Sequence, residues 1–236
     1  IYRPAGADPL GTVLLIHGGA WVGGSVDYHD NLARLLCQQS QANVLSVEYS
    51  RAPGAMYPTQ LREIRAVQRW LTRAGFHKGL WPEPLALCGD SAGGNMAAVL
   101  ARESEAGKVA LVALINPVVD LTLAHVSDAE TRGFSELMVK AYVPVGVDPA
   151  EPSLSPLLAE VPAGHPPTFI AIGESDPWRP EPELYAEKLT AAQIDLEIYR
   201  APTSHLGPDG AAATPLALPT LTATALATVS YTHLTL

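Results

Sequence analysis

Six short apolar runs, separated by stretches with helical character, constrain the fold of this chain more than any other feature. The runs are residues 12–17 (TVLLIH), 43–49 (NVLSVEY), 84–89 (PLALCG), 109–116 (VALVALIN), 168–173 (TFIAIG) and 196–201 (LEIYRA). Nearly continuous apolar runs of this length are typical of strands buried on both faces of a parallel sheet. Their alternation with helices predicts an α/β fold, with a mostly parallel central sheet and helices on both faces.

The intervening segments carry helix and loop signals. Residues 57–75 place apolar side chains at three- to four-residue spacing, with Pro58 near the first turn and Gly75 just past the end. Helix termini favour this asymmetry. Residues 181–193 repeat the pattern, whereas the proline-rich span 144–167 predicts an irregular loop region over the sheet and not a linker between domains.

The composition indicates a globular domain and excludes several partners. The chain has 236 residues, of which 47% are hydrophobic and 17% charged, enough for one large domain and too few to require two. Its 24 acidic and 15 basic residues give a net charge of −9 without a Lys/Arg cluster, so binding to nucleic acid is electrostatically opposed. No apolar run approaches the ~18 residues of a membrane-spanning helix.

The two cysteines, Cys37 and Cys88, stand alone, with no CxxC pair and no His/Cys spacing suited to zinc. We expect both to be buried apolar side chains. The sequence therefore predicts no metal and no cofactor, and it leaves open whether the chain forms a homo-oligomer.

Both ends of the chain are unusual. It starts at Ile1 without an initiator Met, and its first residues resemble the middle of a strand. A preceding segment could have carried a targeting signal, so we expect a cytoplasmic location but leave secretion open. Residues 210–236 contain no Asp, Glu, Lys or Arg. We treat them as a separate C-terminal segment and expect the closing VSYTHLTL not to be native.

A serine between small residues follows the third apolar run. In LCGDSAGGNMAA (87–98), Ser91 has Gly89 two positions before it and Gly93 two positions after it. Between a buried strand and a helix, G-x-S-x-G is the pattern of a nucleophile elbow, which holds the serine in a strained conformation and exposes its hydroxyl. The pattern is short, however, and also fits an ordinary glycine-rich connection.

A glycine pair follows the first apolar run, in LLIHGGAW (14–21). Glycine lets backbone N–H groups approach a substrate oxygen without a Cβ in the way. We therefore expect the N–H groups of Gly18, Gly19 and Ala92 to form an oxyanion hole. We expect His17 to brace this loop by hydrogen bonding and not to transfer protons.

A serine nucleophile needs a histidine base and a carboxylate that orients it. In this type of fold the chain order is Ser, acid, His, with the acid and the base after the last strands. Asp176 follows the fifth apolar run and His205 follows the sixth. The sequence therefore predicts a Ser91–His205–Asp176 triad.

Other candidates fit this order less well. The remaining histidines break the order or lie far from a strand end: His29, His77, His125, His165 and His233. We expect His29 and His77 to be surface residues. Asp120 is the rival acid because it too follows an apolar run, although a loop or helix-capping role suits it better. Glu174 would substitute for Asp176 only if the loop turned differently.

Together HGGAW, GDSAGGN, SDPWR and the later His205 resemble the hormone-sensitive-lipase-like esterases, the GDSAG branch of the α/β-hydrolases. The resemblance runs from about residue 2 to 205 and includes the connecting segment NPVVDLT. It implies an α/β-hydrolase domain over residues 1–209 that hydrolyses short-acyl carboxylic esters without a cofactor. A small-molecule ester is then the expected partner, and Trp21 and Trp178 are expected to contact it.

The chain departs from the family pattern at several places. Residues 49–54 read YSRAPG where the family usually has Y-R-L-A-P-E, and 205–207 read HLG where it has H-G-F. Pro180 and Pro182 predict an unusually stiff segment after Asp176. We also expect the N-terminal helical cap of the family to be absent, because the sequence starts at the strand that should follow it.

Two other functions remain open at this point. An arylformamidase-like amide hydrolase also resembles an HGG-W loop combined with a serine elbow. Some plant hormone receptors resemble the same family but lack a working catalytic histidine, so a non-catalytic ligand-binding protein is the alternative from another class. The presence of His205 disfavours the receptor.

Overall fold

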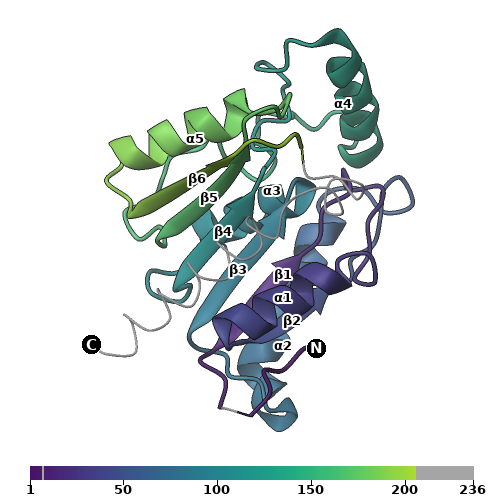
Figure 1. The fold of residues 1–236 in the computed structure, drawn as a ribbon. Coiled ribbons are helices and arrows are strands. Elements are labelled where there is room, and N and C mark those ends of the chain that lie inside the picture. The colour runs from purple at the N-terminus through teal and green to yellow at the C-terminus, as the bar shows by residue number, and fades with distance from the viewer. Residues whose placement is uncertain (7, 206–236) are drawn as a thin grey trace.

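A computed structural model describes residues 1–6 and 8–205 of the chain, and within them six strands form one sheet (Figure 1). The strands are β1 (Thr12–Ile16), β2 (Asn43–Val47), β3 (Leu85–Asp90), β4 (Leu111–Ile115), β5 (Thr168–Gly173) and β6 (Leu196–Ala201). Their order is β2-β1-β3-β4-β5-β6, and every neighbouring pair is parallel. The predicted α/β fold is confirmed.

Helices cover both faces of this sheet. They are α1 (Asp30–Ser40), α2 (Thr59–Ala74), α3 (Ala92–Glu103), α4 (Ala129–Tyr142) and α5 (Pro180–Ala191), with a short 3₁₀ helix at Gly75–Lys78. Side chains alternate between the faces of a strand, so Leu14 and Ile16 of β1 pack in a core with α2, α3 and α5. Val13 and Leu15 pack on the other face, against α1.

Helix α4 stands beside the sheet and not on either face (Figure 1). It lies in the long connection between β4 and β5, and the sequence pattern did not predict it. Only Ser135 and Tyr142 of α4 are buried, so it lacks the apolar stripe that marks a packed helix. Residues 144–167 contain neither helix nor strand, which confirms the predicted loop region.

The helix boundaries follow the predicted proline and glycine signals. Pro58 directly precedes α2 and Gly75 directly follows it. Pro180 and Pro182 occupy the first turn of α5, where a missing N–H costs no hydrogen bond. These prolines therefore start a helix, and the predicted stiff segment is the first turn of α5.

Both cysteines are buried and unpaired, as expected. Across residues 1–6 and 8–205, no helix is long and apolar enough to cross a membrane. The predicted C-terminal segment 210–236 lies outside the described residues, as do Gly207 and His233.

Candidate active site

Ser91 lies on a sharp turn between β3 and α3. Its backbone has φ 51° and ψ −116°, a conformation that L-residues adopt only at a cost of about 1–3 kcal/mol. The turn is held by the N–H of Ser91, which donates to the carbonyl of Ile115 at 2.9 Å. The predicted strained elbow is therefore present, at the carboxyl edge of the sheet.

Close backbone contacts explain the glycines around this serine. A Cβ on Gly89 would lie 2.4 Å from the carbonyl carbon of Gly93, and a Cβ on Gly93 would lie 2.0 Å from the carbonyl oxygen of Ile16. Neither position has room for a side chain. The glycines let α3 start directly against β1 and β3, which leaves the serine at the turn.

The loops after β5 and β6 bring an acid and a base to Ser91. The Nε2 of His205 lies 3.0 Å from Ser91 Oγ, and its Nδ1 lies 2.7 Å from Asp176 Oδ2. The Asp176 side chain is 1% exposed and that of His205 is 17% exposed. Because the carboxylate only accepts, Nδ1 carries a proton and Nε2 is free to accept from the serine hydroxyl.

Further contacts fix this acid and base. The second oxygen of Asp176 accepts the N–H of Trp178 at 2.8 Å. The Trp178 ring lies against His205, with 4.6 Å between the ring centroids, and its Nε1 donates to Ser135 Oγ at 3.1 Å. Trp178 thus connects the loop that carries His205 to α4. Its side chain is half-buried beside the site.

The loop after β1 lies next to Ser91 and turns through left-handed backbone conformations. Gly19 has φ 122°, while Ala20 and Trp21 have φ 52° and 62°. Among the described residues, the N–H groups of Gly19 and Ala92 have no acceptor. The N–H of Gly18, by contrast, donates to Asp90 Oδ1 at 2.9 Å. Only two of the three predicted oxyanion donors are therefore free in this conformation.

His17 is buried and braces the loop, in line with the expectation. Its Nδ1 lies 2.8 Å from the carbonyl oxygen of Gly18, and its ring stacks on Tyr49 with 4.2 Å between centroids. Burial is the main cause of its lowered pKa, and the neighbouring His29 adds to it. A neutral ring in this position donates from Nδ1 to the carbonyl and has no contact with Ser91.

The expectation that His29 is a surface residue is wrong. Its side chain is 12% exposed, and its Nε2 lies 3.1 Å from Asp90 Oδ2. Residues 17–29 fold back over the end of β3, which no periodic pattern in the sequence indicates. His77 is exposed, as expected.

The rival carboxylates have structural contacts. Asp120 accepts the N–H and the hydroxyl of Thr122 at 2.9 and 2.7 Å, and Glu174 is exposed. Glu181 of α5, which the sequence did not single out, accepts the N–H groups of Val119 and Asp120 at 2.9 and 3.1 Å. Burial raises the pKa of Glu181 to about 8, against the effect of these two bonds.

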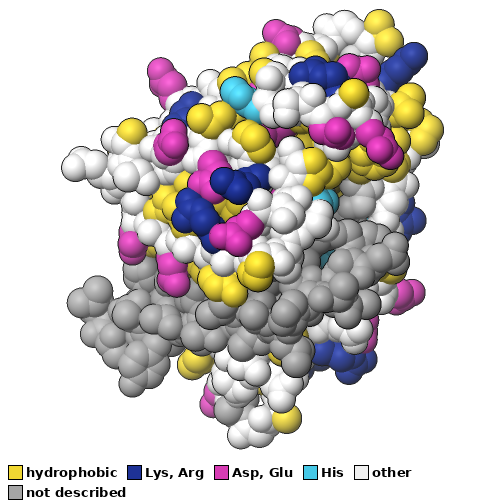
Figure 2. All heavy atoms as spheres, turned by 45° about the horizontal axis from the view of Figure 1, so that its top comes forward, with side chains coloured by type: hydrophobic (Ala, Val, Ile, Leu, Met, Phe, Trp, Pro, Cys, Tyr) yellow, Lys and Arg dark blue, Asp and Glu magenta, His cyan; other side chains and the backbone are white. Residues whose placement is uncertain are grey.

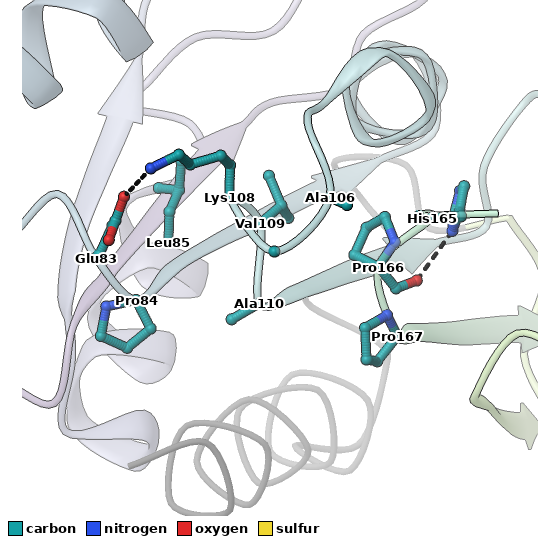
Figure 3. Close-up of a pocket in the computed structure, with 12 residues that line it drawn as sticks. Glu83, Pro84, Leu85, Ala106, Lys108, Val109, Ala110, His165, Pro166 and Pro167 are labelled. Atoms are coloured by element: carbon teal, nitrogen blue, oxygen red, sulfur yellow. Dashed lines mark hydrogen bonds and ion pairs between the residues drawn. The ribbon is translucent and has the colours of Figure 1, made fainter. Parts of the chain in front are cut away.

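His165 lies at the opposite edge of the sheet. It borders a hollow at the amino ends of β3, β4 and β5, where its Nδ1 bonds the carbonyl of Pro166 at 2.9 Å (Figure 3). Because the strands are parallel, this edge is the one farthest from Ser91. Lys108 and Glu83 form an ion pair across the same hollow.

The two predicted substrate-binding tryptophans differ in exposure. Trp178 is half-buried beside His205, whereas Trp21 is 3% exposed and stacks on Tyr142 with 4.7 Å between centroids. The face that bears α4 mixes hydrophobic, acidic and basic side chains (Figure 2). Within residues 1–6 and 8–205, no cluster of His, Cys, Asp or Glu is arranged to hold a metal ion.

Comparison with known proteins identifies the family. A family model described as alpha/beta hydrolase fold matches residues 13–205. The chain belongs to the α/β-hydrolases, in the hormone-sensitive-lipase-like branch. Among curated relatives, this α/β-hydrolase is 36% identical over 214 residues to the carboxylic ester hydrolase LipN of Mycobacterium tuberculosis, covering 84% of this chain but only 57% of LipN.

Two further relatives agree with this assignment. The α/β-hydrolase is 31% identical over 219 residues to an ethyl acetate hydrolase of Pseudomonas putida, covering 86% of this chain and 68% of that protein. The crystal structure of the esterase LipW from Mycobacterium marinum superposes with a TM-score of 0.86 at 27% identity, covering 98% of this chain and 76% of LipW. The resemblance deduced from the motifs is thereby confirmed.

Proposed function

We propose that this α/β-hydrolase is a serine carboxylesterase that acts on short-acyl esters. The observation that carries the proposal is the continuous hydrogen-bonded series from Ser91 through His205 to Asp176. It joins a nucleophile, a base and an orienting carboxylate, which is the arrangement that activates a serine hydroxyl near neutral pH.

The first half of the reaction forms an acyl-enzyme. Nε2 of His205 takes the proton of Ser91 as Oγ attacks the ester carbonyl carbon, and Asp176 stabilises the imidazolium that results. The carbonyl oxygen becomes an oxyanion, which the N–H groups of Gly19 and Ala92 stabilise. His205 then gives its proton to the departing alcohol oxygen, and the carbon–oxygen bond of the ester breaks.

The second half returns the enzyme to its starting state. Water replaces the alcohol, His205 removes a proton from it, and the hydroxide attacks the acyl carbon. The second tetrahedral intermediate collapses, Ser91 recovers its proton from His205, and the carboxylic acid leaves. An oxyanion donor typically contributes about 3–4 kcal/mol to each of these barriers.

The surroundings of the triad support a small substrate. Trp178 lies against His205 and restricts the space beside the base, so we assign it a substrate contact. Trp21 is 3% exposed and stacks on Tyr142, so we assign it an indirect role, in which it shapes the site through the loop after Gly19 and does not itself contact the substrate. The relative named ethyl acetate hydrolase supports the preference for short acyl chains.

Two rival functions are distinguished by the substrate comparison described below. An amide hydrolase of the arylformamidase type would use the same triad, and a non-catalytic receptor would not use it. The hydrogen bond between His205 and Ser91 supports a hydrolase over a receptor. The names of the curated relatives support ester over amide substrates.

Turnover of p-nitrophenyl butyrate, p-nitrophenyl palmitate and N-formylkynurenine by the purified chain tests the proposal. We expect the butyrate to give the highest kcat/KM. Faster turnover of N-formylkynurenine would identify an amide hydrolase, and faster turnover of palmitate would contradict the short-acyl preference. No turnover of any of them by a folded sample would contradict the hydrolase function itself.

A further inference from the structure

Asp90 links the loop after β1 to the nucleophile elbow. It is the last residue of β3, directly before Ser91, and is 8% exposed. One carboxylate oxygen accepts the N–H of Gly18 at 2.9 Å, and the other lies 3.1 Å from Nε2 of His29. A Cβ on Gly18 would lie 2.3 Å from Asp90 Oδ2, so only glycine allows this close approach.

The Gly18–Gly19 peptide group is consequently held from two sides. The N–H of Gly18, which belongs to the preceding peptide group, donates to Asp90. The carbonyl oxygen of the Gly18–Gly19 peptide group lies within hydrogen-bond distance of Nδ1 of His17. The N–H of the same peptide group belongs to Gly19. Because a trans peptide is planar and its C=O and N–H point in opposite directions, fixing the Gly18 carbonyl fixes the direction of the Gly19 N–H.

The contact with His29 stabilises Asp90 in this position. Nδ1 of His29 lies 3.1 Å from the carbonyl oxygen of Ser25, an acceptor only, so Nδ1 carries a proton. Nε2 faces the carboxylate and also donates when the ring is cationic. Burial opposes that charge, but the hydrogen bond and charge of Asp90 outweigh it and raise the pKa of His29.

The other charged or titratable groups near His29 are few. The nearby Glu48 also favours its cation. His17 lies 5.5 Å away between ring centroids and Tyr28 lies 5.6 Å away, and burial keeps His17 on the neutral side. Asp90 is therefore the direct hydrogen-bond partner of His29 and favours its cationic form.

We propose that Asp90 and His29 are positioning residues for the oxyanion hole. Asp90 occupies the N–H of Gly18 so that the N–H of Gly19 is directed at the substrate oxygen, and His29 orients the Asp90 carboxylate. The oxyanion hole then has two backbone donors, from Gly19 and Ala92, and not the three predicted from the sequence. This inference rests on the proposed esterase function.

Substitutions of Asp90 separate positioning from folding. Asp90→Ala leaves the Gly18 N–H without its acceptor, and we expect kcat for p-nitrophenyl butyrate to fall roughly 10²-fold, with KM changed less than about threefold. Binding of a trifluoromethyl ketone, whose adduct oxygen occupies the oxyanion hole, should weaken by a similar factor. Asp90→Asn keeps an oxygen for Gly18 and should retain kcat within about threefold at neutral pH.

The pH profile tests the role of His29. In the wild type, kcat should decline at alkaline pH as His29 loses the proton that it donates to Asp90, and this decline should be absent in His29→Gln and in Asp90→Asn. Asp30→Asn is the matched control, because Asp30 is a neighbouring carboxylate that contacts Tyr2 and Arg34 instead. It should leave kcat, inhibitor binding and the pH profile unchanged.

Several results would overturn the inference while the wild type remains active. They are an Asp90→Ala enzyme with unchanged kcat, an Asp90→Asn enzyme that loses as much kcat as Asp90→Ala, and a rise in KM without a change in inhibitor binding. If kcat still declines at alkaline pH in His29→Gln, His29 does not have the proposed positioning role. A wild-type chain without esterase activity would instead contradict the proposed function.

Discussion

Nε2 of His205 lies 3.0 Å from Oγ of Ser91, although 114 positions separate the two residues in the chain. Strands β4 and β5 lie between β3, which directly precedes Ser91, and β6, which precedes His205. Asn116, after β4, helps the loops to bridge that distance: its Oδ1 accepts the N–H of Gly173 at 2.8 Å, and its Nδ2 donates to the carbonyl of Ser204 at 3.4 Å. The contact thus depends on the order of the whole sheet.

Asp176→Asn should lower kcat for p-nitrophenyl butyrate by about 10⁴-fold. The asparagine amide faces Nδ1 of His205 as a donor, so the imidazole proton moves to Nε2 and the ring no longer accepts from Ser91. KM should change little, because the side chain does not contact substrate. Steady-state kinetics above and below neutral pH measure both constants.

Asp120→Asn is the control for this variant, since Asp120 also follows a strand and is fully buried. Its kcat should stay within about threefold of the wild type. If Asp120→Asn is the variant that loses activity while Asp176→Asn keeps it, the assignment of the acid is incorrect.

Gly93→Ala should destabilise the protein by about 3 kcal/mol, the upper end of what overpacking typically costs, and also reduce kcat. The added methyl would lie 2.0 Å from the carbonyl oxygen of Ile16, so the start of α3 must shift away from β1. Urea unfolding followed by circular dichroism gives the free energy of unfolding.

Gly133→Ala provides the opposite case. Gly133 lies inside α4, where an added Cβ meets nothing within 4 Å, so the substitution should stabilise the protein by about 0.5–1 kcal/mol. Equal effects of the two alanine variants would contradict the packing account of the elbow.

Glu181→Gln should reduce the loss of stability at alkaline pH. Burial raises the pKa of Glu181 from its ordinary value of 4.5 to about 8 in the folded protein, so the folded state holds this proton more tightly than the unfolded state. Its contribution to stability is complete below about pH 4.5 and is lost as pH rises through 8. Glutamine cannot ionise and lacks this dependence.

Thermal melting of both proteins between pH 5 and pH 9 measures the difference. Glu181→Gln should melt higher than the wild type above pH 8, and its advantage should shrink toward pH 5. Parallel melting curves across the whole range would show that Glu181 is ionised in the folded protein at neutral pH, contrary to this expectation.

The strands and the chain order of the site residues could be predicted from sequence because they follow from local patterns. The runs 168–173 and 196–201 match β5 and β6 residue for residue. The run 109–116 extends past β4 at both ends, and at its carboxyl end Asn116 leaves the strand with φ 42°. The positions of Asp176 and His205 follow from the rule that loops at the carboxyl ends of parallel strands meet at one edge.

Contacts that depend on tertiary folding could not be predicted in the same way. Helix α1 buries Ala33, Leu36 and Cys37 at helical spacing, a pattern that the sequence does carry, whereas α4 has no such stripe. The hydrogen bond between Gly18 and Asp90 joins residues 72 positions apart, and neither residue type predicts it. The same holds for His29, whose partner is defined only by the path of the loop.

The most direct test of the central claim is covalent labelling with a fluorophosphonate, read by intact mass and peptide mapping. We expect one adduct per wild-type chain, on Ser91, none on Ser91→Ala, and much slower labelling of Asp176→Asn. A folded wild-type sample that gains no adduct, or gains it at another residue, would contradict the assignment of Ser91 as the activated nucleophile.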